Sequence, residues 1–201
     1  ETSGATADNE EGTSAYDGTY SGGFTLNQTG PATGIAAVDL NGTSGYISIP
    51  HSNALFPSSF TFEGWVYLDA VSGVDVIVDG LGSNKGWQLL YTSGSGGTFQ
   101  ARIGNGYTTT VSVFNAPAFT AAAWHHVCLV YNATDYSVKL YIDGQLAGSD
   151  TTVAYSTQTS GGYRFGSTLA GASFFDGKFA AFGIYDVAKS AADIAELYEA
   201  T

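Results

Sequence analysis

Six residues between positions 84 and 107 have the side-chain types that a sugar-binding surface uses. They are Asn84, Trp87, Tyr91, Arg102, Asn105 and Tyr107. An aromatic ring can stack on the apolar face of a pyranose, while amide and guanidinium groups bind its hydroxyls. Because Trp87 and Tyr91 lie four residues apart in an expected strand, their side chains share one face. We take these six residues as a candidate carbohydrate site; the alternative is that Trp87 fills the core.

Acidic residues near the start of the chain form a second candidate site, for a calcium ion. Asp8, Asn9, Glu11 and Asp17 lie in a segment rich in glycine and small polar residues. Calcium prefers carboxylate and carbonyl oxygens, and an irregular segment can supply both. The sequence therefore predicts Ca²⁺ as a cofactor; the alternative is a solvated acidic segment.

Glycosidase chemistry needs two carboxylates at a defined separation, and Asp75 and Asp79 form the nearest such pair. On one face of a strand they would lie roughly 13 Å apart. Retaining enzymes need about 5 Å and inverting enzymes about 6.5–9.5 Å. Glu63 has no carboxylate two residues away, which favours a buried structural role. We therefore expect that the protein is not an enzyme.

The three histidines and the cysteine also favour structural roles. His125 and His126 are adjacent in an expected strand, so their side chains point to opposite faces and cannot bind one ion together. His51 follows a proline in an expected turn. Cys128 is the one cysteine, so no intrachain disulfide can form, and its apolar neighbours predict a buried thiol.

The elements that position these residues are mostly strands. Segment 124–148 predicts two strands joined by a polar turn and closed by a second turn at Asp143-Gly144, because Val138, Leu140 and Ile142 alternate with more polar residues. Short strands separated by glycine-rich turns are also expected at 37–40, 46–50, 60–69, 74–78, 86–92, 98–103, 108–114, 163–166 and 178–185. Residues 1–34 indicate an irregular segment with one short edge strand. Ser190 predicts the start of a short helix.

Four segments, in order along the chain, resemble laminin-G-like domains of the concanavalin A-like lectin/glucanase superfamily. They are Leu40-Asn41-Gly42 with Tyr46–Pro50, Ser59–Val66, the hairpin 124–148, and Phe175–Phe179 with Ile184–Ser190 and Asp193-Ile194. The resemblance covers most of residues 8–198. It implies an all-β fold, a two-sheet antiparallel jelly-roll sandwich, to which the sequence adds one short C-terminal helix.

The resemblance also bears on calcium. Related domains often hold one calcium ion between the N-terminal segment and an aspartate on the last strand. The matching position here is Ala180, which removes that ligand. Asp176 or a backbone carbonyl is expected to substitute for it, and Asp176 completes the predicted metal set.

Length and charge limit the remaining possibilities. At 201 residues and 44% hydrophobic content, residues 1–201 are expected to form a single domain. Eighteen acidic residues against six basic ones give a net charge of −12, which disfavours nucleic acid as a partner. No apolar run reaches the ~18–20 residues needed for membrane insertion.

Two classes of function follow from the sequence and the resemblance. We expect a non-catalytic carbohydrate-binding or adhesion module, extracellular (secreted or displayed at a surface), whose partner is a polysaccharide or glycan. The alternative is a structural component of a virion, fibre or extracellular filament, with the chain in a homo-oligomer or larger assembly. A lyase or hydrolase is disfavoured because no acid/base pair is present.

Overall fold

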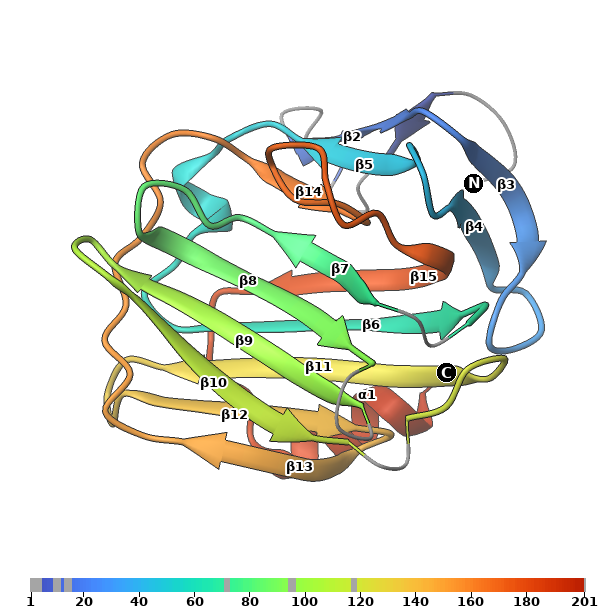
Figure 1. Ribbon diagram of the computed structural model, residues 1–201. Helices are drawn as coiled ribbons and strands as arrows, with labels where there is room; N and C mark the ends of the chain where they lie inside the picture. Colours follow the sequence, from blue (N-terminus) through green and yellow to red (C-terminus); the bar gives the residue numbers. More distant parts are fainter. Residues whose placement is uncertain are drawn as a thin grey trace.

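A computed structural model describes residues 5–8, 12, 16–70, 73–93, 97–116 and 119–200. Within these residues, two antiparallel β-sheets lie face to face (Figure 1). The predicted two-sheet antiparallel sandwich is therefore confirmed.

The first sheet has eight strands among the described residues. Their bounds are β1 Thr6–Ala7, β2 Gly18–Ser21, β5 Tyr46–Ile49, β7 Val74–Asp79, β8 Lys85–Thr92, β9 Thr98–Asn105, β10 Thr109–Asn115 and β14 Tyr163–Phe165. They follow the order β1-β2-β5-β14-β7-β8-β9-β10 across the sheet, so β1 and β10 form its two edges.

The second sheet has seven strands in the described part of the chain. Their bounds are β3 Phe24–Thr29, β4 Ala36–Asn41, β6 Phe60–Leu68, β11 Trp124–Asn132, β12 Ser137–Ile142, β13 Gln145–Asp150 and β15 Asp176–Tyr185. Their order is β13-β12-β11-β6-β15-β4-β3. The short 3-10 helix η2, Asn53–Leu55, joins β5 to β6.

Aromatic side chains from both sheets fill the space between them. Phe60 of β6 stacks on Trp87 of β8 with ring centroids 4.8 Å apart. Phe62 and Phe99 are also fully buried in this core. Alternate residues of each strand point into it, as the period of two predicts. The inner face of β8 is therefore part of the main core.

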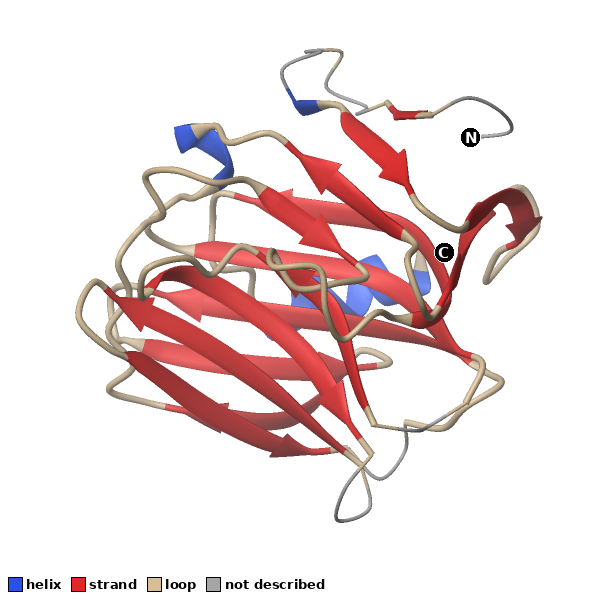
Figure 2. Ribbon diagram, turned by 45° about the horizontal axis from the view of Figure 1, so that its top comes forward, coloured by secondary structure: helices blue, strands red, loops and turns tan. Residues whose placement is uncertain are grey.

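The outer face of the seven-stranded sheet is covered by the helix α1, Ala191–Glu199 (Figure 2). Ser190 and Asp193 form a reciprocal capping box at its start, so the helix predicted from Ser190 is confirmed. Ile194 is fully buried, and Tyr198 stacks on Trp65 with ring centroids 5.7 Å apart. No helix in the described ranges is long and apolar enough to cross a membrane.

The predicted hairpin in segment 124–148 is formed by β11, β12 and β13. The turn residues Asp143 and Gly144 have φ of +51° and +73°, which matches the turn type that Asp-Gly favours. Asp143 also accepts a hydrogen bond from the backbone N–H of His126 at 2.9 Å. The turn side chain therefore ties the hairpin back to β11.

The N-terminal segment is more regular than predicted. Its described residues form β1, β2 and β3 rather than one short edge strand. β3 is interrupted by an irregularity between Thr25 and Gln28, where Asn27 has φ +58°. β1 and β2 have only two and four residues. Runs this short and irregular are too brief to produce a sustained alternation in the sequence.

Candidate functional site

Two hairpin turns meet at one end of the eight-stranded sheet, at the left of Figure 1. The first joins β7 to β8, where backbone hydrogen bonds of 2.9 Å link Gly82 and Lys85 in both directions. Its central residues, Ser83 and Asn84, have φ of +52° and +59°. Asparagine tolerates this left-handed conformation better than most residues. The turn therefore presents Asn84 at its tip.

The second turn joins β9 to β10 and contains Tyr107. Its shape is fixed by Asn105, whose Oδ1 accepts hydrogen bonds from the backbone N–H groups of Tyr107 at 2.9 Å and Thr108 at 2.8 Å. The Asn84 side chain then links the two turns, because its Nδ2 donates to the carbonyl of Tyr107 at 2.9 Å. A hydroxyl of Thr109 donates to Asn84 Oδ1 at 3.1 Å.

A third segment supports the two turns from the loop after β13. The backbone N–H of Ser156 donates to the carbonyl of Gly104 at 2.7 Å, and its carbonyl accepts from Gly86 at 2.9 Å. Gly104 has no room for a side chain, because a Cβ there would lie 2.3 Å from the carbonyl of Asn84. Close backbone packing therefore fixes the geometry of this end.

The ring of Tyr107 is the most exposed large hydrophobic side chain among the described residues, at 89% exposed. Such a ring on a rigid turn is available for stacking. Asn84 and Asn105 each donate only one of their two amide N–H groups to a described partner. The surface formed by Asn84, Arg102, Asn105 and Tyr107 is called the loop-end surface below.

Arg102 lies on the outer face of β9. Its guanidinium donates to Gln88 Oε1 at 3.3 Å and to Gln100 Oε1 at 3.2 Å, which holds it in place. Val111 lies directly opposite on β10 and is 47% exposed. Val113, at 58% exposed, extends the same apolar strip. Sequence reasoning missed these valines, although their alternation with the buried Phe114 indicates an outward face.

The structure contradicts the exposed aromatic pair expected from Trp87 and Tyr91. Trp87 is 0% exposed and Tyr91 is 3% exposed. They do share a face, but that face points into the core, where Trp87 stacks on Phe60 and Tyr91 contacts Phe99 at 5.3 Å between ring centroids. These two residues are thus removed from the candidate carbohydrate site. For the other four residues, sugar binding stays a prediction.

The expected common face of Asp75 and Asp79 is also wrong. A register shift between Val76 and Val78 inserts an extra residue into β7. Asp75 consequently lies opposite Tyr91, whose ring is in the core, and Asp79 lies opposite Gln88 on the outer face. Residues directly opposite each other share a face, so the two carboxylates point apart.

The carboxylate of Asp79 accepts hydrogen bonds from nearby backbone N–H groups. Its oxygens accept hydrogen bonds from the N–H groups of Leu81 at 2.9 Å and Leu169 at 2.8 Å. Burial raises the pKa of this carboxyl, and these two N–H groups oppose the shift. The carboxylate thus fastens the loop after β14 to β7, which is a structural role.

Glu63 lies on the outer face of β6, in contact with two neighbouring strands. One carboxylate oxygen is 2.8 Å from His126 Nε2, and the other accepts from the hydroxyl of Tyr185 at 3.1 Å. His126 is fully buried. These contacts support the predicted structural role of Glu63, because they join β6, β11 and β15 beneath α1.

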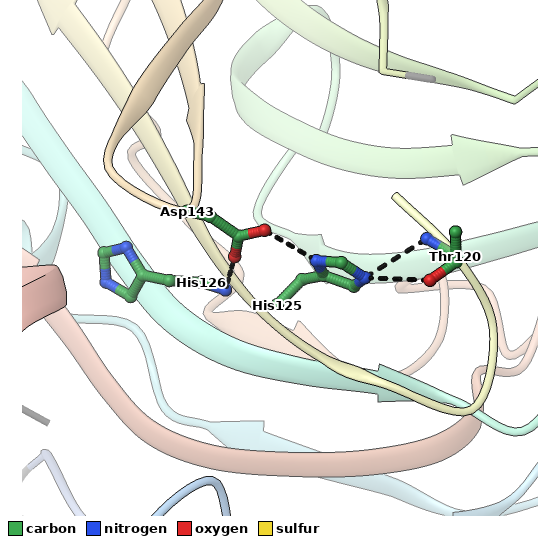
Figure 3. Close-up of polar contacts among 4 residues, drawn as sticks. All are labelled: Thr120, His125, His126 and Asp143. Atoms are coloured by element: carbon green, nitrogen blue, oxygen red, sulfur yellow. Dashed lines mark hydrogen bonds and ion pairs between the residues drawn. The ribbon is translucent and has the colours of Figure 1, made fainter. Parts of the chain in front are cut away.

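His125 points to the opposite side of β11, between Asp143 and Thr120 (Figure 3). Its Nδ1 lies 2.8 Å from Asp143 Oδ2. Its Nε2 accepts from the backbone N–H of Thr120 at 3.2 Å and lies 3.4 Å from the hydroxyl of that residue. The arrangement looks like an acid–histidine–hydroxyl relay. The backbone N–H occupies the Nε2 lone pair that a general base would need, so His125 fixes the 119–123 loop to the hairpin.

The described members of the predicted calcium set do not form a metal site together. Asp8 and Asp17 flank the short pair β1–β2, whereas Asp176 begins β15 opposite Asn41. In the part of the chain that the structure describes, no three His, Cys, Asp or Glu side chains are placed to hold an ion.

Two further members of that set, Asn9 and Glu11, lie outside the described residues. Ala180, at the position of the missing aspartate, is buried in an outer cluster with Ala37 and Trp65. Among the residues that the structure describes, no cluster of acidic side chains forms a calcium centre. Calcium binding stays a prediction.

Comparisons with known proteins agree with this architecture. The description of the matching family is "Concanavalin A-like lectin/glucanases superfamily", and the match covers residues 41–195. No curated protein matches the chain.

Several solved structures share the fold. The binding domain of botulinum neurotoxin DC, in complex with rat synaptotagmin II, has a TM-score of 0.72 at 17% identity, over 98% of this chain and 51% of that one. The binding domain of Paraclostridial Mosquitocidal Protein 1 has a TM-score of 0.73 at 13% identity, over 97% and 51%. A third structure is described as "Cell entry of botulinum neurotoxin type C is dependent upon interaction with two ganglioside molecules". It has a TM-score of 0.69 at 16% identity, over 98% of this chain and 50% of that one. The chain thus spans about half the length of these proteins.

Proposed function

This chain belongs to the concanavalin A-like lectin/glucanase superfamily, and from that premise we propose that it is a non-catalytic carbohydrate-binding or adhesion module. Its ligand is a polysaccharide or glycan, held at the loop-end surface. The observation that carries the proposal is the Tyr107 ring, which is 89% exposed on a turn fixed by Asn84 and Asn105.

The loop-end surface has the two kinds of group that sugar recognition needs. The Tyr107 ring offers an apolar face for the C–H face of a pyranose. The free amide N–H groups of Asn84 and Asn105 can donate to sugar hydroxyls beside that ring. Hydrogen bonds already hold both amides, so binding would cost little side-chain entropy.

Arg102 and Val111 extend this surface along the outer face of the sheet. The guanidinium of Arg102 is held by two glutamine side chains and keeps N–H groups for a ligand hydroxyl. Val111 adds apolar contact on the neighbouring strand. Together with Tyr107, this strip suits more than one sugar ring, which favours an oligosaccharide over a monosaccharide.

The contacts of the candidate catalytic groups support a binding function rather than catalysis. Asp75 and Asp79 face opposite ways, Glu63 has both oxygens engaged, and the Nε2 of His125 accepts a backbone N–H. Two of the similar solved structures are described as binding domains, and the description of a third names an interaction with two ganglioside molecules. We further propose that the module is secreted or displayed at a surface, where glycans are accessible.

A glycan array followed by titration of the best ligand tests the proposal. Tyr107→Ala is expected to weaken binding about tenfold or more, corresponding to ~1.4 kcal/mol, because the stacking face is lost. Tyr136→Ala is the matched control, since Tyr136 is also an exposed tyrosine on a turn, at 54%. Equal binding by wild type and Tyr107→Ala, or no binding to any glycan class, would overturn the proposal. Repeating the titration with EDTA tests whether binding needs calcium.

A further inference from the structure

A row of directly opposed side chains crosses the outer face of the eight-stranded sheet from β7 to β10. Asp79 lies opposite Gln88, Gln88 lies opposite Arg102, and Arg102 lies opposite Val111. Residues directly opposite one another on neighbouring strands share a face of the sheet. All four side chains therefore lie on the face that points away from the main core.

Arg102 is a cation that only neutral groups hold in place. Its Nη1 donates to Gln88 Oε1 at 3.3 Å, and its Nη2 donates to Gln100 Oε1 at 3.2 Å. None of the ion pairs in the part of the chain that the structure describes involves Arg102. This guanidinium thus has no carboxylate bound to it, although acidic residues outnumber basic ones by 18 to 6.

Asp79 is the carboxylate of this row, and it is directed elsewhere. Two strand spacings, roughly 10 Å, separate its backbone from that of Arg102, and Gln88 lies on the strand between them. Its oxygens accept from the backbone N–H groups of Leu81 and Leu169. Burial raises the pKa of Asp79, while hydrogen bonds from those N–H groups and from Gln88, together with the charge of Arg102, oppose the shift. Asp79 therefore interacts with Arg102 at a distance and does not neutralise it by contact.

The N–H groups of Arg102 that remain for a ligand are at the end of its side chain. A guanidinium carries five N–H groups. Two of them donate to the glutamines, and Nε is buried without a partner among the described residues. Each of the two terminal nitrogens thus keeps one N–H. Two such groups on neighbouring nitrogens can bind both oxygens of a carboxylate.

Two exposed valines lie beside this guanidinium. Val111 is directly opposite Arg102, and Val113 is directly opposite Gln100. Directly opposed residues have Cβ atoms about 4.5–5.5 Å apart, so one sugar ring can contact Val111 while a carboxylate on that ring reaches Arg102. A sugar acid has both the apolar C–H groups and the carboxylate that match this arrangement. We call Gln88, Gln100, Arg102, Val111 and Val113 the Arg102 patch.

We propose that the Arg102 patch binds a carboxylate-bearing sugar, a sialic or uronic acid, within the glycan that the loop-end surface holds. The inference rests on the proposed function and names the class of glycan. Arg102 binds the carboxylate, and the two valines contact the sugar ring. The hydrogen bonds from Arg102 to Gln88 and Gln100 already fix the guanidinium, which lowers the entropy cost of binding.

The net charge of the protein selects among acidic glycans. At −12 the chain repels a densely charged polyanion at long range. A single carboxylate in contact with Arg102 is attracted at short range. One sugar acid among neutral sugars is therefore favoured over a chain that carries a charge on every residue.

Titration of the full chain with two matched pairs of probes tests the proposal. The pairs are sialyllactose with lactose, and glucuronosyl-xylotriose with xylotriose. We expect the acidic member of at least one pair to bind about tenfold or more tighter than its neutral partner, because hydrogen bonds to a charged group are the stronger ones. The pair that shows this difference assigns the carboxylate to a sialic or a uronic acid. The methyl ester of the acidic probe, which lacks the charge, is expected to bind as weakly as the neutral partner.

Variants of Arg102 locate the effect. Arg102→Gln is expected to abolish the difference between the acidic and neutral probes. Arg102→Lys keeps the charge without the paired N–H groups and is expected to retain only part of the difference. Lys139→Gln is the matched control, because it removes the same charge from the other sheet, where Lys139 lies opposite Val130 and Ser149. Urea unfolding of each variant checks that it is folded.

Failure of this inference is distinguishable from failure of the proposed function. No binding by either acidic probe, equal binding by acidic and neutral probes, or a preference that survives Arg102→Gln overturns the inference. Tighter binding by heparin than by both acidic probes also overturns it, since the patch would then bind polyanions. The proposed function stands in each case as long as the glycan array yields a ligand whose binding Tyr107→Ala weakens.

Discussion

Asp75 is a carboxyl group placed where its charge is disfavoured. It is 3% exposed on β7, and its Oδ2 has no hydrogen-bond partner among the described residues. Burial raises the pKa of Asp75 to about 6, although the backbone N–H of Asp176 opposes the shift. The neighbouring carboxylate of Asp176 raises it further. Folding therefore favours the protonated form of this group.

The sign and size of the effect on stability follow from this pKa. A shift from 3.8 to about 6 corresponds to ~3 kcal/mol at most. Because the folded pKa is raised, the contribution of Asp75 to the free energy of unfolding is fully present below pH 3.8. It is lost as the pH rises and is absent well above pH 6. Asp75→Asn removes the titration and keeps the side-chain shape.

Urea unfolding of wild type and Asp75→Asn at several pH values between 4 and 8 measures this directly. The variant should gain stability relative to wild type as the pH rises, by up to ~3 kcal/mol across the series. Asp135→Asn is the control, because hydrogen bonds from Ser137 lower the pKa of Asp135 and any pH-dependent difference has the opposite sign. A difference between Asp75→Asn and wild type that stays constant with pH would refute the reasoning.

Three further predictions concern the core, the thiol and the helix. Trp87→Ala should lower the free energy of unfolding by about 3–5 kcal/mol in urea titrations, because the fully buried ring leaves a cavity, while glycan affinity of the folded fraction stays unchanged. Cys128 should not react with a thiol reagent at pH 8 until urea is added, since burial raises its pKa and the thiol is inaccessible; rapid reaction of the native protein would contradict this. Ser190→Ala should cost about 1 kcal/mol and speed hydrogen exchange at the start of α1, because the hydroxyl that accepts from the backbone N–H of Asp193 is lost, and unchanged exchange there would count against the capping box.

The parts of the fold that were predictable are those with local signals. Asp143-Gly144 specifies its turn through backbone preferences of two adjacent residues, and Ser190 specifies a helix start through its own hydroxyl. The burial of Trp87 could not be predicted from a local sequence signal of this kind. An aromatic residue on an exposed strand face and one on a core face give the same alternation, and only the position of β8 opposite β6 decides between them.

Irregular pairing accounts for the other differences. The register shift between Val76 and Val78 turns Asp75 and Asp79 to opposite faces of the sheet. No glycine or other turn residue in this stretch of the sequence indicates that shift. The register of β15 against β6 shifts around Ala181, although alanine is not a residue that favours positive φ. Both features arise from packing between strands that are distant in sequence. The turn that contains Asn105 was predictable, because glycine and asparagine indicate where hairpins end.

The central claim is that glycans bind at the loop-end surface. The most direct measurement is a titration of the isotope-labelled protein with its best array ligand, followed by amide and side-chain NMR shifts. Our account predicts that the largest saturable shifts occur at Asn84, Arg102, Asn105 and Tyr107, with smaller ones at Val111. Saturable shifts confined to other surfaces, with these residues unmoved, would contradict it.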